Sequence, residues 1–263
     1  MPTIISRPRA ATLRALERIE AARRLQRDGA RILGAHLEGP MLTRAGAHPK
    51  RHLRAVTRAE WSQARMITVA PERPGALSLI RAASRQRLVA IGHSDADAAT
   101  ARRAVDAGAR LVGHLFNAMR GFHHRDESIL NVALTDPRLA CELIYDGHHV
   151  SRSAAQVAVM CKGPKLILVS DATAPGGTFR LRKGRMTDGG GRLAGSAELL
   201  PQGLRRAVRD FGDGAVDWAT RNPARLLGLR TGELRPGYAA DLIVMDDRFN
   251  VRAAWVGGVE KGS

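Results

Sequence analysis

IGHSDADAATARRAVDAGARLVGHLFNAM, residues 91–119, is the stretch that decides the fold of this chain. Two short apolar runs, 88–91 and 111–112, each lead into a Gly-His pair, and a segment of helical periodicity separates them. Gly108 supplies the left-handed residue that ends such a helix. A strand–helix–strand unit makes its two strands parallel. His93 and His114 are therefore predicted at the same C-terminal sheet edge, where parallel α/β proteins carry out their chemistry.

The same strand-then-helix alternation continues along most of the chain. Apolar runs followed by polar or turn residues predict seven strand ends, near Ser6, Glu38, Ala70, His93, His114, Asp146 and Asp171. Individual elements are expected as a strand over 32–37, a hairpin over 187–191 and a short helix that Asn222 caps and Pro223 opens. Repeated β-α units favour a parallel barrel of the TIM type over an open sheet. A closed barrel needs eight strands, so we expect one strand fewer than closure requires.

The length and composition limit the class of protein. With 263 residues the chain is expected to form one large α/β domain, and no apolar run is long enough to span a membrane. The first residues lack the pattern of a signal peptide. Cys141 and Cys161 are the only cysteines, too few for a disulfide framework or a thiolate zinc site. We therefore expect a cytoplasmic protein with no membrane partner.

The positive charge of the chain raises the question of whether it binds nucleic acid. The formal net charge is +17, and only five of the 42 basic residues are lysine. The arginines are scattered over predicted helices, and aromatic residues, which would stack on single strands, make up 4% of the chain. These patterns favour solvated arginine-rich helix faces over a nucleic-acid site. An anionic small substrate would also suit the charge.

Four predicted strand ends carry the groups of a metal-assisted hydrolase. Glu38, His93 and His114 would supply a carboxylate and two imidazoles, a set that leaves a zinc position open for water. Asp171, after another apolar strand, would be the carboxylate that moves a proton. Each residue alone also has a structural explanation, as a helix cap, a core histidine or an ion-pair partner. Their recurrence at successive strand ends favours a catalytic site.

Nine motifs carry a resemblance to a known family. They are HLEGP (36–40), GAHP (46–49), IGHSDA (91–96), HLFNAM (114–119), DGHHV (146–150), SDA (170–172), LAGSA (193–197), ATRNPA (219–224) and GYAADLIVMD (237–246). In this order they resemble the N-acetylglucosamine-6-phosphate deacetylase family of the amidohydrolase superfamily. The resemblance implies a (β/α)8 barrel of the metallo-dependent hydrolase kind over residues 1–228. Residues 229–263 would then be the C-terminal strands of a small β-sandwich.

The resemblance also implies roles for residues. Glu38, His93 and His114 would hold one divalent ion per subunit, expected to be zinc, and Asp171 would be the general base and then the acid. His48 would help to polarise the acetamide carbonyl. Arg125 and His149 would bind the 6-phosphate, with Arg125 reaching in from the neighbouring subunit of a homodimer. The full set of implied substrate-binding residues is Ala47, His48, Asn117, Ala118, Arg125, His149, Leu193, Ala194 and Gly195.

The sequence also departs from the family pattern. The family's first barrel strand, of the form PGFID, and its H-x-H pair have no counterpart here, so a second metal ion has no evident ligands. The loop between Glu38 and His48 is short, which would shift His48 relative to the metal. Two alternatives to the glucosamine activity follow: deacetylation of N-acetylgalactosamine 6-phosphate, and a truncated, non-catalytic remnant of the family.

Overall fold

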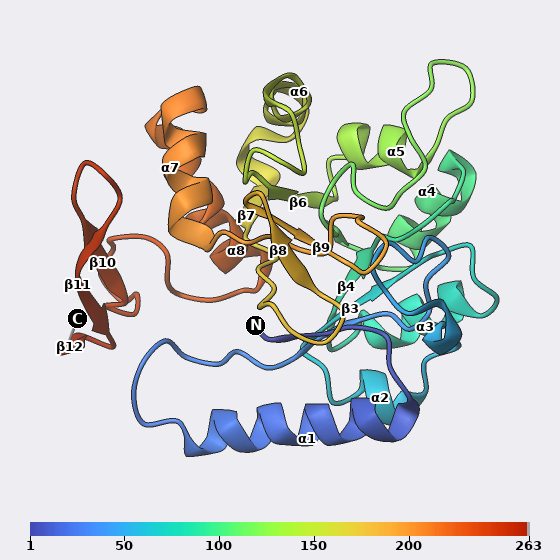
Figure 1. The fold of residues 1–263 in the computed structure, drawn as a ribbon, viewed down its shortest axis with the longest axis horizontal. Coiled ribbons are helices and arrows are strands. Elements are labelled where there is room, and N and C mark those ends of the chain that lie inside the picture. Colours follow the sequence, from blue (N-terminus) through green and yellow to red (C-terminus); the bar gives the residue numbers. More distant parts are fainter. Residues whose placement is uncertain (262–263) are drawn as a thin grey trace. The chain divides into compact units, whose positions relative to one another are not determined.

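The structure, a computed structural model, describes residues 1–261 and divides the chain into two compact units. The first unit contains residues 1–26 and 32–141, and the second contains residues 27–31 and the chain from Glu142 onward. Seven strands form one sheet in the order β1-β2-β3-β4-β5-β6-β7, and the pairs from β1 to β6 are parallel. Figure 1 labels β3, β4, β6 and β7 of this sheet. This order in sequence, with helices between the strands, is that of a TIM-type barrel sheet with seven of its eight strands. The predicted fold class is confirmed.

The first unit carries five strands and the beginning of a sixth. Its elements are β1 (Thr3–Ile4), α1 (Arg9–Leu25), β2 (His36–Glu38), η1 (Lys50–His52), α2 (Arg58–Trp61), β3 (Met66–Val69), α3 (Ala76–Ala83), β4 (Leu88–Ile91), α4 (Ala98–Asp106), β5 (Leu111–Val112) and α5 (Ile129–Thr135). Every residue of β3 is buried, as expected for a parallel strand covered on both faces. The segment of helical periodicity predicted between the two strands is α4, which buries an apolar stripe at positions 98, 101, 104 and 105. Gly108 follows this helix with φ +117°.

The second unit follows the strand β6 (Ala140–Ile144), which begins in the first unit. Its other elements are α6 (Arg152–Lys162), η2 (Gly163–Lys165), β7 (Leu166–Val169), β8 (Arg180–Arg182), β9 (Arg185–Thr187), α7 (Leu200–Phe211), η3 (Asp213–Trp218), α8 (Arg221–Leu226), β10 (Leu242–Met245), β11 (Val251–Val256) and β12 (Val259–Lys261). Strands β8 and β9 form a hairpin, and β10, β11 and β12 form an antiparallel sheet of their own. Within residues 1–261 no helix is long and apolar enough to cross a membrane.

Two local predictions are wrong. The strand expected over 32–37 begins only at His36, because Gly34 has φ +122°, a left-handed conformation that strands exclude. Asn222 does not cap α8: the helix begins at Arg221 after Thr220, and Asn222 is buried inside it. The Asn222 side chain donates instead to the carbonyl of Leu166, 2.8 Å away. A buried strand carbonyl needs a donor, and this requirement outweighs the residue's capping preference.

Candidate active site

A buried carboxylate stands at the centre of the first unit's polar cluster. Glu38 is the last residue of β2, and three imidazoles surround it. Its Oε1 lies 3.0 Å from Nε2 of His114 and 3.3 Å from Nε2 of His93, and its Oε2 lies 3.4 Å from Nε2 of His48. All four side chains are at least nine-tenths buried. The strand order therefore brings together residues up to 76 positions apart in sequence.

The electrostatics of the cluster keep the carboxylate ionised. Burial on its own would raise the pKa of Glu38, but its close contacts with the imidazoles of His114, His48 and His93 hold it well below its usual range. Burial lowers the pKa of His93, which favours its neutral form. An ionised carboxylate and neutral imidazoles are the protonation states in which these groups bind divalent metal ions.

His93 has the hydrogen bonding of a metal ligand. Its Nδ1 lies 2.6 Å from the carbonyl oxygen of Arg44. A carbonyl only accepts, so Nδ1 carries the proton and Nε2, the nitrogen facing Glu38, keeps its lone pair. Metal-ligating histidines in proteins are fixed in the same way by a donor bond from their second nitrogen. The backbone N–H groups of Thr43 and Arg44 also donate to the His93 carbonyl, at 3.0 and 2.8 Å.

His48 has the opposite arrangement. The backbone N–H of Ser6 donates to Nδ1 of His48 over 3.1 Å, so this nitrogen is an acceptor. The neutral ring must then carry its proton on Nε2, which points to Glu38 as a donor. One potential ligand atom each from Glu38, His48 and His93 lie within 4.8 Å of one another. The tautomer nevertheless excludes neutral His48 from the ligand set and leaves it a hydrogen-bond donor at the site.

The remaining set, Glu38, His93 and His114, fits a divalent ion. One carboxylate and two imidazoles form the three-ligand site that catalytic zinc uses, with a further position for water. His114 closes β5 with φ +27°, and His93 follows β4 with φ +48°. Both side chains are turned toward Glu38 by these left-handed backbone conformations, which non-glycine residues rarely adopt.

The loop after β5 lies against the turn after β4. The carbonyl of Ala118 accepts from the backbone N–H of Ser94 over 3.1 Å. The Asn117 side chain donates to the carbonyls of His114 and Leu115, so it closes its own turn. Ala47 and Asn117 are half-buried, whereas Arg125 lies in a loop, residues 121–127, that is exposed throughout.

Glu72, which sequence reasoning did not select, supports the turn that carries His93. Its carboxylate accepts from the Ser94 hydroxyl at 2.7 Å and from the backbone N–H of Asp95 at 2.6 Å. Ser6 was also missed, and its bond to His48 spans 42 residues. Neither residue has a signal in the local sequence, because each is defined by a partner on another strand end.

In the second unit, residues 193–196 (LAGS) lie against the turn that follows β7. Asp171 follows this strand with φ +47°, and its carbonyl accepts from the backbone N–H of Ser196 over 2.8 Å. Gly195 has φ +75°, and a Cβ there would stand 2.6 Å from the Asp171 carbonyl oxygen. Only glycine fits such an approach. Ala194 is buried beside it, and Leu193 is half-buried.

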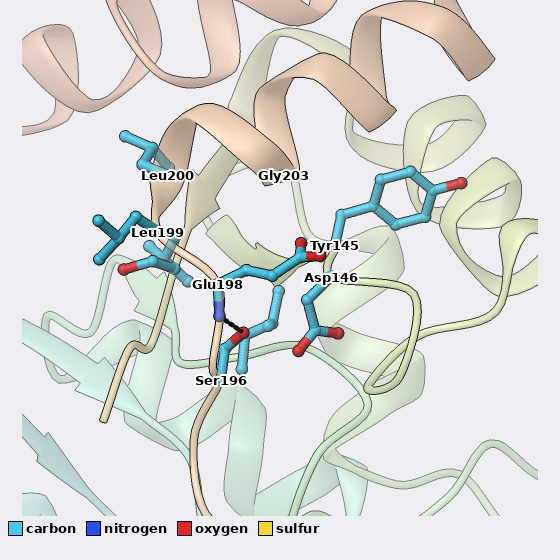
Figure 2. Close-up of a pocket in the computed structure, with 10 residues that line it drawn as sticks. Tyr145, Asp146, Ser196, Glu198, Leu199, Leu200 and Gly203 are labelled. Atoms are coloured by element: carbon cyan, nitrogen blue, oxygen red, sulfur yellow. Dashed lines mark hydrogen bonds between the residues drawn. The ribbon is translucent and has the colours of Figure 1, made fainter. Parts of the chain in front are cut away.

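A small, open pocket lies at the ends of β6 and β7 within the second unit. Tyr145, Asp146, Ser170 and Ser196 are among its lining residues (Figure 2). His149, predicted to bind phosphate, lies beside it, and its Nδ1 is 2.8 Å from Oδ2 of Asp146. Hydrogen bonds from His149 and from the backbone of residues 148 and 149 hold the pKa of Asp146 well below its usual range, although burial alone would raise it.

Comparison with known proteins agrees with this architecture. The model of the amidohydrolase family matches residues 10–262, and the chain belongs to that family. Over 98% of its length the chain is 35% identical to the N-acetylgalactosamine-6-phosphate deacetylase of Escherichia coli O157:H7, of which it covers 76%. It is 34% identical, over 97% of its length, to the N-acetylglucosamine-6-phosphate deacetylase of Vibrio furnissii, of which it covers 71%.

Solved structures give the same relation. The chain matches the N-acetylglucosamine-6-phosphate deacetylase of Pasteurella multocida with a TM-score of 0.92 and 26% identity, over 100% of this chain and 76% of that one. It matches the enzyme from Mycobacterium smegmatis, in complex with N-acetyl-D-glucosamine-6-phosphate, with a TM-score of 0.87 and 33% identity. That match covers 98% of this chain and 75% of the other. The predicted family is confirmed.

Proposed function

We propose that this chain is a metal-dependent deacetylase that hydrolyses N-acetylglucosamine 6-phosphate to glucosamine 6-phosphate and acetate. The observation that carries the proposal is the buried cluster of Glu38 with His93 and His114 in a member of the amidohydrolase family. Relatives that are 34–35% identical over nearly the whole chain are named for this activity or its galactosamine counterpart.

Glu38, His93 and His114 would hold one divalent ion, which we propose to be zinc. When bound, the ion lowers the pKa of a water molecule toward neutrality and polarises the acetamide carbonyl. The hydrogen bond from His93 to the Arg44 carbonyl keeps the ring in the tautomer that this role requires. The carboxylate supplies the negative charge that a divalent ion needs in a buried site.

His48 would donate its Nε2–H to the acetamide oxygen as negative charge develops on it. This role uses the tautomer that the Ser6 backbone imposes. Asp171 would accept the proton of the attacking water and then deliver it to the nitrogen of the departing amine. In this way one carboxylate acts first as a base and then as an acid.

We propose that Ala47, Asn117 and Ala118 contact the sugar together with Leu193, Ala194 and Gly195. Arg125 and His149 would bind the 6-phosphate, because a guanidinium matches the geometry of phosphate oxygens. The exposure of Arg125 supports its service to the neighbouring subunit of a homodimer. Two free cysteines fit a reducing cytoplasm, where we place the enzyme.

The test is to purify the chain, measure the metal content per protomer, and assay acetate release from N-acetylglucosamine 6-phosphate. We expect one metal ion per protomer and an activity that a chelator abolishes and zinc restores. A protein that binds the metal without releasing acetate would support a non-catalytic remnant. The galactosamine epimer must be assayed in parallel, because the relatives of both names are almost equally similar to this chain.

A further inference from the structure

Asp146 and His149 form a buried pair that the catalytic steps above do not use. Both side chains are 6% exposed, and Asp146 lies at the end of β6 while His149 precedes α6. The carboxylate Oδ2 lies 2.8 Å from Nδ1 of His149, and Oδ1 accepts the backbone N–H groups of His148 and His149 at 2.9 and 3.0 Å. Three hydrogen bonds on one carboxylate fix both the turn and the ring.

The pair is held on a rigid base. Asp146 leaves the strand on the side opposite to Tyr145, and the two side chains diverge in Figure 2. The Tyr145 hydroxyl donates to Asp210 over 2.6 Å. Arg206 donates to the Tyr145 carbonyl over 3.0 Å and pairs with Glu198. Because the hydroxyl and the carbonyl of Tyr145 are both hydrogen-bonded to α7, the backbone next to Asp146 is held in place.

The hydrogen bond decides which nitrogen of His149 can meet a ligand. Because an ionised carboxylate only accepts, Nδ1 carries a proton and donates it to Asp146. Within residues 1–261 the structure gives Nε2 of His149 no hydrogen-bond partner. A second proton, on Nε2, would make the ring a cation beside the Asp146 carboxylate. The imidazole is then a donor suited to a phosphate oxygen.

We propose that Asp146 is a positioning residue that makes His149 selective for a phosphorylated substrate. The inference rests on the proposed function and deepens it. Asp146 would contact neither the sugar nor the reacting carbonyl. It would set the orientation and charge of His149, so that the phosphate group gains a charge-assisted hydrogen bond. A sugar without phosphate would gain nothing from it.

The test compares Asp146→Asn with the wild type in two assays. In the first, inorganic phosphate is titrated into each metal-loaded protein by calorimetry. We expect Asp146→Asn to weaken phosphate binding roughly 10- to 100-fold, the range of one hydrogen bond to a charged group. In the second, the KM for N-acetylglucosamine 6-phosphate should rise by a similar factor, with kcat within about threefold and the KM for unphosphorylated N-acetylglucosamine unchanged.

Asp246→Asn is the matched control. The Asp246 carboxylate also accepts two backbone N–H groups and pairs with a cationic side chain, Arg252, in the turn between β10 and β11. It should change neither phosphate affinity nor KM. His149→Gln should reproduce the effect of Asp146→Asn, and the double variant should add little to either, because the two residues act as one unit.

The outcomes separate the two proposals. If no sugar is deacetylated but phosphate binding is lost in Asp146→Asn, the proposed function fails and the positioning role stands. If the wild type does not bind phosphate, the positioning role is wrong. It is also wrong if Asp146→Asn raises the KM of both sugars equally, or if it lowers the melting temperature without changing phosphate binding, because Asp146 would then only support the turn.

Discussion

The first prediction concerns His48, for which the distances and the hydrogen bonds of the cluster indicate different roles. By distance alone, its Nε2 belongs with Glu38 and His93 as a third metal ligand. By hydrogen bonding, the Ser6 backbone N–H occupies Nδ1 and leaves a proton on Nε2. We therefore expect His48→Asn to keep the metal and to lose catalysis.

The magnitudes follow from the contacts. The distance of 3.4 Å between His48 and Glu38 lies beyond the usual range of a hydrogen bond, so removing His48 should weaken zinc binding by less than about 10-fold. The loss of a donor to the developing oxyanion should lower kcat by roughly 100- to 1,000-fold. Glutamine extends its amide to about the place of Nε2, whereas asparagine reaches only that of Nδ1. His48→Gln should therefore retain more activity than His48→Asn.

The assay is a zinc titration against a fluorescent chelator, paired with acetate release under saturating zinc. His52→Asn is the control, since His52 lies in the nearby η1 helix and has no place in the cluster. Zinc affinity reduced by more than about 100-fold in both His48 variants would make His48 a ligand and refute the tautomer argument. A glutamine variant no better than asparagine would refute the donor role alone.

Three further predictions follow. Asp171→Asn should abolish turnover while the metal content stays near that of the wild type, and a near-normal kcat would contradict its role in proton transfer. Gly46→Ala would place a Cβ 3.0 Å from Cε1 of His93 at φ +55°, so it should weaken zinc binding several-fold more than Gly75→Ala, which has a similar φ of +80° and open space. Burial and the bond to Asp210 raise the pKa of Tyr145 to about 12, so in a Tyr238→Phe background the absorbance at 295 nm should report a tyrosine titrating near that value. The neutral phenol stabilises the fold below pH 10, and this contribution, about 2 kcal/mol, is lost as the pH rises to 12; an equal pH profile in Tyr145→Phe would contradict it.

The strand ends were predictable because their signals are local. Parallel strands buried on both faces read as short apolar runs, and each run here ends at a polar or turn residue. The chemistry at Glu38, His93 and His114 followed, since parallel strands deliver their carboxyl ends to one edge of a sheet. Hydrophobic patterning and topology therefore suffice to assemble the cluster.

The roles within the cluster were not predictable in the same way. The Ser6 bond that sets the tautomer of His48 joins residues 42 positions apart, and its donor is a backbone group that any residue except proline would supply. Asp146 stands three residues before His149, inside a motif that the sequence displays, yet nothing in the motif shows that the two side chains meet. Proton positions depend on three-dimensional partners, and sequence patterns do not encode them.

The backbone at three strand ends adopts a conformation that their residue types rarely adopt. His93, His114 and Asp171 all have positive φ, between +27° and +48°, where a side chain costs about 1–2 kcal/mol relative to glycine. Glycine would relieve that strain but would remove the imidazole or the carboxylate. The surrounding structure holds the strained conformation, through the bonds of residues 43 and 44 to the His93 carbonyl and of Ser196 to the Asp171 carbonyl. Left-handed turns therefore orient these side chains, and the strain falls on the residues whose chemical groups the proposed mechanism uses.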